Sequence, residues 1–337
     1  MQQNPSKQPI TITGLDFNAY LKKLYAETSR QKRFRGKTVH EFRAWEASAR
    51  PTVIELLSID HLTPKTPAME ILDESEQEGY RIQKIAYQTL PDVWVPAYLL
   101  TPTTGKPPFP TVLCPPGHGG GINQVMNEDG AYHKYAHRFA EAGFVTLVPE
   151  NISFGERANP NQGYRGCSFE HEALNLLGST VIGYRMWELQ RALDLLETLP
   201  QVDKQRIGCA GLSLGGEMTL YLAACDTRVR VACIACFLTS FRGTFLKEPH
   251  CTCGYVPKMT RYFEHADIAT LIAPRPLMVQ AGTRDGSFLV ADARQSYEEL
   301  VPVYRLLGAE QQVALDVFEG GHEFHVEPAL RWFQQWL

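Results

Sequence analysis

The sequence predicts an α/β fold in which helices flank a mostly parallel sheet, preceded by an N-terminal helical extension. Short apolar segments typical of buried strands alternate with helix-forming segments over most of the chain, and such alternation indicates parallel strands joined by helices. One strand-like run at 207–212 passes through Gly-x-Ser-x-Gly at 211–215 into a helix-forming run at 217–224. This strand–turn–helix context around Ser213 is the strongest single indication of the fold.

The composition is that of an ordinary soluble globular protein, with 337 residues of which 44% are hydrophobic and 21% charged. A net charge of −4 and the lack of a long Lys/Arg run argue against a nucleic-acid partner. The N-terminus does not resemble a signal peptide, and no apolar stretch approaches the roughly 18 residues of a membrane span. Most of the eight cysteines lie in apolar segments, as in proteins of a reducing compartment. We therefore expect a cytoplasmic protein with no membrane partner, and the sequence leaves its oligomeric state open.

Residues 1–79 are expected to form the helical extension, and residues 80–337 the α/β domain. Apolar side chains recur three and four positions apart between residues 15 and 60, which predicts helices there. Pro51 is expected in the first turn of one helix, where its missing N–H is not needed.

The α/β domain is expected to open with two strands between residues 80 and 100, joined by a turn at 90–92. Further strands are expected at 111–114, 144–148, 207–212, 229–235, 276–281 and 313–318, and helices at 129–142, 183–199, 289–307 and the C-terminus. The segments 150–180 and 238–268 interrupt this alternation as lid-like excursions. Ligands of such sheets bind at the carboxyl ends of the strands, so the residues directly after each strand are the functional candidates.

Ser213 is the candidate nucleophile, at the tip of a strained turn between strand and helix. Side chains two positions before and after it would collide with the neighbouring strand and helix. Gly211 and Gly215 occupy those positions, and glycine has no Cβ to clash.

The strand at 111–114 leads into the glycine-rich segment His118-Gly119-Gly120-Gly121. Glycines let backbone N–H groups approach a substrate oxygen, so the N–H of Gly119 or Gly120 is expected to form an oxyanion hole with the N–H of Leu214. His118 is a candidate for the rim of the site. Glu150, which follows the strand at 144–148, is another, as a carboxylate that contacts substrate or organises the loop. The alternative for this carboxylate is an ion pair with Arg157 or another nearby arginine.

Asp285 and His322 follow the strands at 276–281 and 313–318, and with Ser213 they give the chain order Ser, Asp, His. A serine hydroxyl attacks only when a base takes its proton; imidazole is that base, and the carboxylate fixes its tautomer. His325 and Asp292 are the rivals of His322 and Asp285, both expected inside helices. Asp203, by contrast, is expected to be a structural residue in the turn before the strand at 207–212.

The segment His250-Cys251-Thr252-Cys253 raises the question of a zinc site. Zinc needs four ligands at suitable spacing, and His265 is the only further candidate near this segment in the sequence. A disulfide between Cys251 and Cys253 is sterically awkward. We therefore expect no metal and no cofactor, and these residues to line the lid or pack beneath it.

With these residues in place the chain resembles the α/β-hydrolases, in particular their bacterial acetyl-xylan-esterase-like, dienelactone-hydrolase-like branch. The resemblance covers residues 80–337 and rests on the segments 98–102, 116–120, 202–208, 211–216, 271–276 and 320–322. Dienelactone hydrolases use cysteine as nucleophile where this chain has Ser213. This difference argues against a dienelactone as the substrate of this chain. The helical extension also exceeds the minimal fold.

The predicted function is that of a serine carboxylester hydrolase, in which Ser213, His322 and Asp285 transfer the acyl group of a small ester to water. The resemblance implies a small-molecule substrate such as an acetylated carbohydrate. The alternatives are a peptidase or amidase on the same fold, and a non-catalytic binding protein that retains the three residues.

Overall fold

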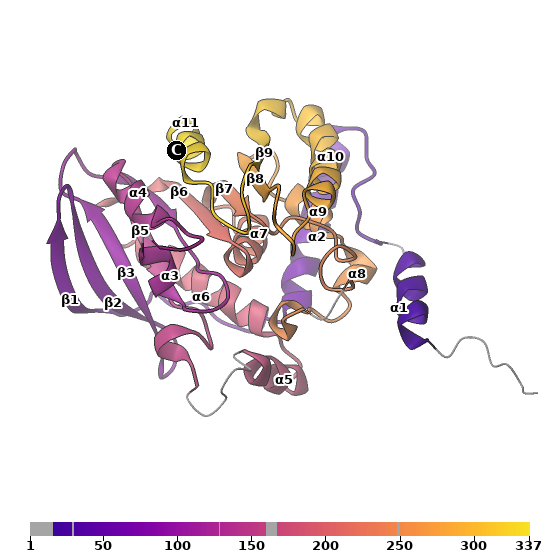
Figure 1. Cartoon of the computed structure of the whole chain (residues 1–337), viewed down its shortest axis with the longest axis horizontal. Helices are drawn as coiled ribbons and strands as arrows, with labels where there is room; N and C mark the ends of the chain where they lie inside the picture. Colours follow the sequence, from indigo (N-terminus) through magenta and orange to yellow (C-terminus); the bar gives the residue numbers. More distant parts are fainter. Residues whose placement is uncertain (1–15, 29, 128, 160–166, 248–249) are drawn as a thin grey trace, which may run out of the picture.

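The computed structural model describes residues 16–28, 30–127, 129–159, 167–247 and 250–337, and its core is a nine-stranded sheet (Figure 1). The strand order is β1-β2-β3-β5-β4-β6-β7-β8-β9. The strands are β1 (Met69–Gln77), β2 (Tyr80–Leu90), β3 (Val93–Pro102), β4 (Phe109–Leu113), β5 (Val145–Pro149), β6 (Val202–Leu212), β7 (Val229–Ala235), β8 (Leu277–Gly282) and β9 (Val313–Phe318). The main helices are α1 (Phe17–Ala26), α2 (Val39–Leu57), α3 (Ile122–Met126), α4 (Tyr135–Glu141), α5 (Ser168–Leu176), α6 (Val181–Leu196), α7 (Leu214–Cys225), α8 (Met259–Tyr262), α9 (His265–Thr270), α10 (Val290–Leu306) and α11 (Val326–Trp336).

The sheet is parallel from β5 to β9 and antiparallel from β1 to β5, which confirms the predicted mostly parallel α/β fold. The predicted strand pair between residues 80 and 100 is the β2–β3 hairpin. Its turn contains Asp92 at a φ of 61°. The parallel strands β4, β6, β7, β8 and β9 bring their carboxyl ends to one edge of the sheet, where the candidate functional residues follow them.

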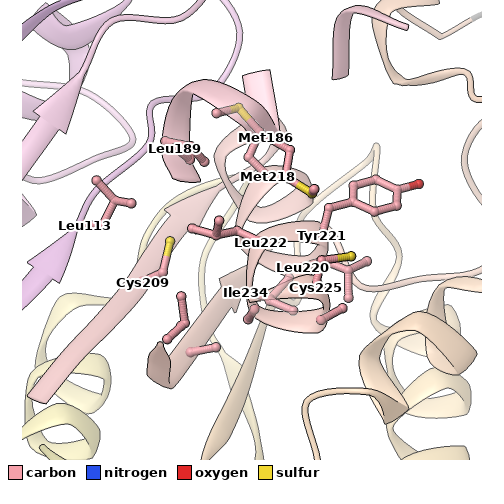
Figure 2. Close-up of a cluster of buried hydrophobic side chains, with 14 of the residues drawn as sticks. Leu113, Met186, Leu189, Cys209, Met218, Leu220, Tyr221, Leu222, Cys225 and Ile234 are labelled. Atoms are coloured by element: carbon pink, nitrogen blue, oxygen red, sulfur yellow. The ribbon is translucent and has the colours of Figure 1, made fainter. Parts of the chain in front are cut away.

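Helices pack on both faces of the sheet. One core cluster combines strand residues with α3, α4 and α11, and contains Tyr135 and Phe333. The other cluster joins the opposite face to α2, α6, α7, α9 and α10. Figure 2 shows part of the second cluster, in which Met218 and Leu222 of α7 lie among side chains of α6 and of the sheet. All residues of α7 are buried, as expected for a central helix that is apolar on every side.

The N-terminal region differs from its predicted all-helical form. Residues 69–77 form the edge strand β1, which pairs antiparallel with β2. The eight residues after Met69 are exposed, so this segment has no apolar face of the kind that a packed helix buries. Pro51 lies inside α2 and does not start a helix. The start of α2 is set by Thr38 and Glu41, whose side chains form a capping box. No helix within the described ranges is both long and apolar enough to cross a bilayer.

The two lid-like excursions contain more helix than expected. The first, 150–180, includes a short 3₁₀ turn at Gly155–Arg157 and the helix α5, while residues 160–166 lie outside the described residues. The second, 238–268, includes a 3₁₀ turn at Thr252–Gly254, α8 and α9. The helix predicted at 129–142 is shorter, with α4 covering only 135–141.

His265 of α9 is a fully buried titratable group in the second excursion. Its Nδ1 is 2.9 Å from the Thr239 carbonyl oxygen, and its ring lies 3.9 Å from that of Phe241. Burial lowers the pKa of His265 to about 4, although the hydrogen bond with Thr239 opposes the shift. As the pH falls, the His265 imidazole therefore takes up a proton near pH 6.5 in the unfolded chain but only near pH 4 in the folded protein.

We expect the free energy of unfolding to be unaffected by His265 above pH 6.5 and to fall by about 3 kcal/mol between pH 6.5 and 4. Urea unfolding at a series of pH values measures this loss. The matched variant His265→Asn keeps a side-chain donor for the Thr239 carbonyl but does not titrate, so its stability should depend less on pH in this window. Parallel losses in the wild type and in His265→Asn would contradict this origin of the acid sensitivity.

Candidate active site

Ser213 lies between β6 and α7 in a strained backbone conformation, with φ 61° and ψ −123°. The neighbouring glycines are required by the close packing of this turn. A Cβ on Gly211 would lie 2.3 Å from the carbonyl oxygen of Gly215, and one on Gly215 would lie 2.2 Å from that of Pro115. The collisions predicted for these positions are therefore present, and strain of this kind is typical of functional turns.

The glycine-rich segment after β4 passes beside Ser213. A Cβ on Gly117 would lie 3.3 Å from the Cβ of Ser213. Two residues further on, Gly119 has a φ of +112°, which favours glycine. Gln124 donates from Nε2 to the His118 carbonyl (3.1 Å) and so braces this segment. Leu214 is the first residue of α7, where the backbone N–H has no acceptor within the helix.

The structure brings Asp285 and His322 together. His322 Nδ1 is 2.7 Å from Asp285 Oδ2, while Asp285 Oδ1 accepts hydrogen bonds from the N–H groups of Ser287 (2.8 Å) and Phe288 (3.0 Å). Burial alone would raise the pKa of Asp285, but the hydrogen bond from His322 and those from the backbone hold it below its usual value. An ionised Asp285 can only accept, so His322 Nδ1 carries the proton and Nε2 is left free to act as a base.

Backbone contacts between adjacent strands connect this pair to the serine. Ser213 N–H donates to the Ala235 carbonyl at the end of β7 (3.0 Å). The next residue, Cys236, has its sulfur within 4.8 Å of ligand atoms of both Asp285 and His322. The loops that carry the pair are also joined, since the N–H of Arg284 donates to the Gly320 carbonyl (2.8 Å).

The rival residues lie in other arrangements. His325 Nδ1 is 2.8 Å from Asp316 Oδ2, so the chain has a second His–Asp pair three residues along. The expectation that His325 lies inside a helix is wrong, because His325 precedes α11 as its N-cap; Asp292 lies in α10 as expected. Asp203 lies within β6, which begins at Val202, and not in the turn expected before that strand. Its carboxylate accepts from Arg206 Nε (2.7 Å) and from the Gln205 N–H (3.0 Å), so its contacts are local ones.

The two residues expected at the rim both make contacts within the protein. Glu150 is 2% exposed and accepts hydrogen bonds from the N–H groups of Ile122 (3.2 Å) and Asn151 (3.1 Å). By accepting these two backbone hydrogen bonds, the Glu150 carboxylate holds the start of α3 to the segment after β5. The alternative ion pair with Arg157 is not formed, because Arg157 pairs with Glu188 at 2.7 Å. His118 directs Nε2 at the sulfur of Cys253 (3.0 Å).

The sequence did not single out three residues that support the site. The Tyr132 hydroxyl accepts the Gly117 N–H (2.8 Å), and burial raises the pKa of Tyr132 to about 12 although that hydrogen bond opposes the shift. Phe288 stacks on the His322 ring with 5.4 Å between ring centroids. Cys236 donates from Sγ to the Glu323 carbonyl (3.5 Å). Phe288 and Cys236 follow closely on β8 and β7, so reading the residues after the strand ends could have found them; Tyr132 has no such signal.

Solved structures with this architecture include several esterases. A "putative acetyl xylan esterase" from Bacteroides fragilis NCTC 9343 superposes with a TM-score of 0.76 at 20% identity, over 91% of this chain and 83% of that one. A glucuronoyl esterase from Solibacter usitatus gives a TM-score of 0.67 at 17% identity, over 87% and 93% of the two chains. An acetyl xylan esterase from Paenibacillus sp. R4 gives 0.62 at 18%, over 94% and 99%. These likenesses confirm the α/β-hydrolase fold.

Sequence comparison finds a relative with a higher identity than the three structures above. The "Putative hydrolase YtaP" of Bacillus subtilis (strain 168) is 27% identical over 282 residues, which cover 80% of this chain and 93% of that protein. The sequence profile of the Abhydrolase family matches residues 14–300, and so includes most of the N-terminal region as well as the Ser213 turn and Asp285. The chain belongs to the Abhydrolase family.

Proposed function

We propose that this protein is a serine carboxylester hydrolase that acts by acyl transfer, with Ser213 as nucleophile, His322 as base and Asp285 as the residue that orients the base. The observation that carries the proposal is the 2.7 Å contact between His322 Nδ1 and Asp285 Oδ2, on loops adjacent to the strained Ser213 turn. The contact fixes the tautomer that a base for serine needs.

In the first half of the reaction, Ser213 Oγ attacks the ester carbonyl carbon while His322 Nε2 takes the hydroxyl proton. Asp285 stabilises the imidazolium that results. His322 then returns the proton to the leaving alcohol, and an acyl-serine remains. In the second half, His322 takes a proton from water and the resulting hydroxide attacks the acyl carbon. The carboxylic acid then leaves as His322 returns that proton to Ser213 Oγ, which restores the serine hydroxyl and the neutral imidazole.

The tetrahedral intermediate carries its negative charge on the former carbonyl oxygen. We assign its stabilisation to the N–H of Leu214 at the start of α7 and to that of Gly119 or Gly120. A helix N-terminus places positive partial charge where the oxyanion develops. The left-handed backbone at Gly119 permits the close approach of a substrate oxygen to this segment.

For the substrate we propose a small acyl ester such as an acetylated carbohydrate. The support is the set of structural neighbours, which are named as acetyl xylan esterases and a glucuronoyl esterase. All of these neighbours are named as esterases, and two of the names specify acetyl xylan, whereas the two alternative functions have no comparable support.

A substrate panel tests the proposal. We expect p-nitrophenyl acetate to be hydrolysed with a higher kcat/KM than longer acyl esters, and acetate to be released from acetylated xylo-oligosaccharides. Aminoacyl p-nitroanilides should be poor substrates. Turnover of the anilides with no turnover of any ester would instead assign the protein as an amidase, and turnover of neither class would favour a binding protein.

A further inference from the structure

Three cysteines and one histidine converge at a single point beside the proposed site. His118 Nε2 lies 3.0 Å from Cys253 Sγ, Cys251 Sγ lies 3.3 Å from Cys253 Sγ, and Cys167 Sγ lies 3.0 Å from Cys251 Sγ. The four ligand atoms all lie within 4.8 Å of one another. We refer to these four residues as the Cys3His cluster.

The members of the Cys3His cluster come from three separate parts of the chain. His118 belongs to the glycine-rich segment after β4, and Cys167 is the N-cap of α5. Cys251 is the N-cap of the 3₁₀ turn at 252–254, and Cys253 lies within that turn. His118 and Cys253 are 135 positions apart, and Cys167 and Cys251 are 84 apart. The prediction of no metal depended on ligands close in sequence and could not include these partners, while His265, the candidate it did consider, turns away to Thr239.

The arrangement matches a tetrahedral zinc site in ligand type and in size. Structural zinc sites are commonly Cys3His, with zinc–sulfur distances of about 2.3 Å and zinc–nitrogen distances of about 2.0–2.1 Å. A tetrahedron of those bond lengths has edges of about 3.5–3.8 Å. The spacing of the four atoms, from 3.0 to at most 4.8 Å, brackets that value.

The charge of the surroundings fits a zinc thiolate centre as well. Three thiolates and one Zn²⁺ leave a single net negative charge, and the buried guanidinium of Arg185 lies beside Cys167 and Cys253. Arg185 is 1% exposed and donates from Nη2 to the Ile152 carbonyl (2.9 Å), while its Nε and Nη1 have no hydrogen-bonding partner among the described residues. Glu217, the nearby buried acid, forms no ion pair with Arg185 in the described part of the chain. The centre would give this cation the counter-charge that a buried guanidinium requires.

We propose that His118, Cys167, Cys251 and Cys253 bind one structural Zn²⁺ ion. All four positions are then protein ligands, so the ion has no open site for substrate and its role is to stabilise the fold. It joins both lid-like excursions to the segment that begins at His118. Because Gly119 follows directly, the ion also holds the backbone to which the proposed function assigns an oxyanion donor.

Metal analysis of the whole protein tests the proposal without reference to its activity. Protein purified under reducing conditions should contain about one zinc ion per chain by plasma mass spectrometry. Exchange for Co²⁺ should produce thiolate-to-cobalt charge-transfer absorption and the intense visible bands of tetrahedral cobalt. Removal of the ion with a chelator should lower the melting temperature, and added Zn²⁺ should restore it.

Single replacements identify the ligands. Cys251→Ser, Cys253→Ser and Cys167→Ser should each weaken zinc binding by more than the about 10–100-fold that loss of an outer-shell contact costs. Cys225→Ala, which alters a buried cysteine of α7 outside the cluster, should keep about one zinc ion per chain. If the ligand variants do not fold, titration of the wild type with an organomercurial decides the question, because zinc should be released as the cluster thiols react.

Two results would overturn the proposal. One is a reduced, folded protein that contains no zinc and binds neither Zn²⁺ nor Co²⁺. The other is a metal-free protein whose intact mass is two hydrogens lower without reductant, with a peptide map that links Cys167 to Cys251; that result would assign a disulfide in place of the metal. A failure of ester hydrolysis would leave the zinc content unchanged, so the two proposals fail separately.

Discussion

Replacing Ser213 by alanine is expected to reduce kcat for p-nitrophenyl acetate by at least about 10⁴-fold, because the hydroxyl that would form the acyl-enzyme is gone. The residual rate would come from the oxyanion donors and substrate binding. The melting temperature should change little. The backbone strain at φ 61° is the same for serine and alanine, and the N–H to the Ala235 carbonyl remains.

Two measurements make this result specific to the nucleophile. Circular dichroism and thermal unfolding of Ser213→Ala must show a folded protein. Ser75→Ala, a hydroxyl deletion on the exposed strand β1, should leave kcat unchanged and serves as the matched control. A Ser213→Ala protein that retains wild-type turnover would rule out Ser213 as the nucleophile.

Replacing His322 by alanine is expected to lower kcat by about 10⁴–10⁶-fold, since the serine then has no base. The chain offers an unusually close control, because His325–Asp316 is a second His–Asp pair with nearly the same contact distance, 2.8 Å against 2.7 Å. His325→Ala should therefore change kcat only slightly. Esterase assays of the two variants side by side compare a paired imidazole at the proposed site with one outside it.

The carboxylates extend the same comparison. Asp285→Asn should reduce kcat by about 10⁴-fold, because an amide can donate to Nδ1 and so favour the wrong tautomer of His322. Asp316→Asn should not. Equal losses in the two aspartate variants, or a larger loss in His325→Ala than in His322→Ala, would contradict the assignment of the base.

Much of this site was predictable because its residues follow strands directly. The parallel order of β6, β7, β8 and β9 places the residues after them at one edge. Ser213, Asp285 and His322 could therefore be proposed from the Gly-x-Ser-x-Gly motif and from the order of residues that follow the strands. The role of Gly211 and Gly215 was predictable as well, because the tight turn from β6 into α7 leaves no room for a Cβ at either position.

The features that escaped prediction depend on contacts between distant segments. Glu150 follows a strand and yet turns inward, where its carboxylate accepts hydrogen bonds from the N–H groups of Ile122 and Asn151. The partners of Cys251 and Cys253 are brought together only when both excursions fold over the sheet. Residues 69–77 form a strand although almost all of their side chains are exposed, because the pairing with β2 is made by the backbone.

The zinc proposal and the esterase proposal meet at one place in the chain. His118 would be held by the ion, and the next two residues, Gly119 and Gly120, carry the proposed oxyanion donor. A flexible glycine segment gains precision when one end is fixed, and precise donor placement is what stabilises the intermediate. Zinc removal should therefore affect kcat more than the loss of stability alone would explain.

Covalent labelling shows whether Ser213 is the nucleophile of this protein. A fluorophosphonate probe incubated with the native protein should add once per chain, and peptide mass spectrometry should place the adduct on Ser213. Labelling should be absent from Ser213→Ala and greatly slowed in His322→Ala. An adduct on another residue, or no adduct on an enzyme that turns over esters, would contradict the account.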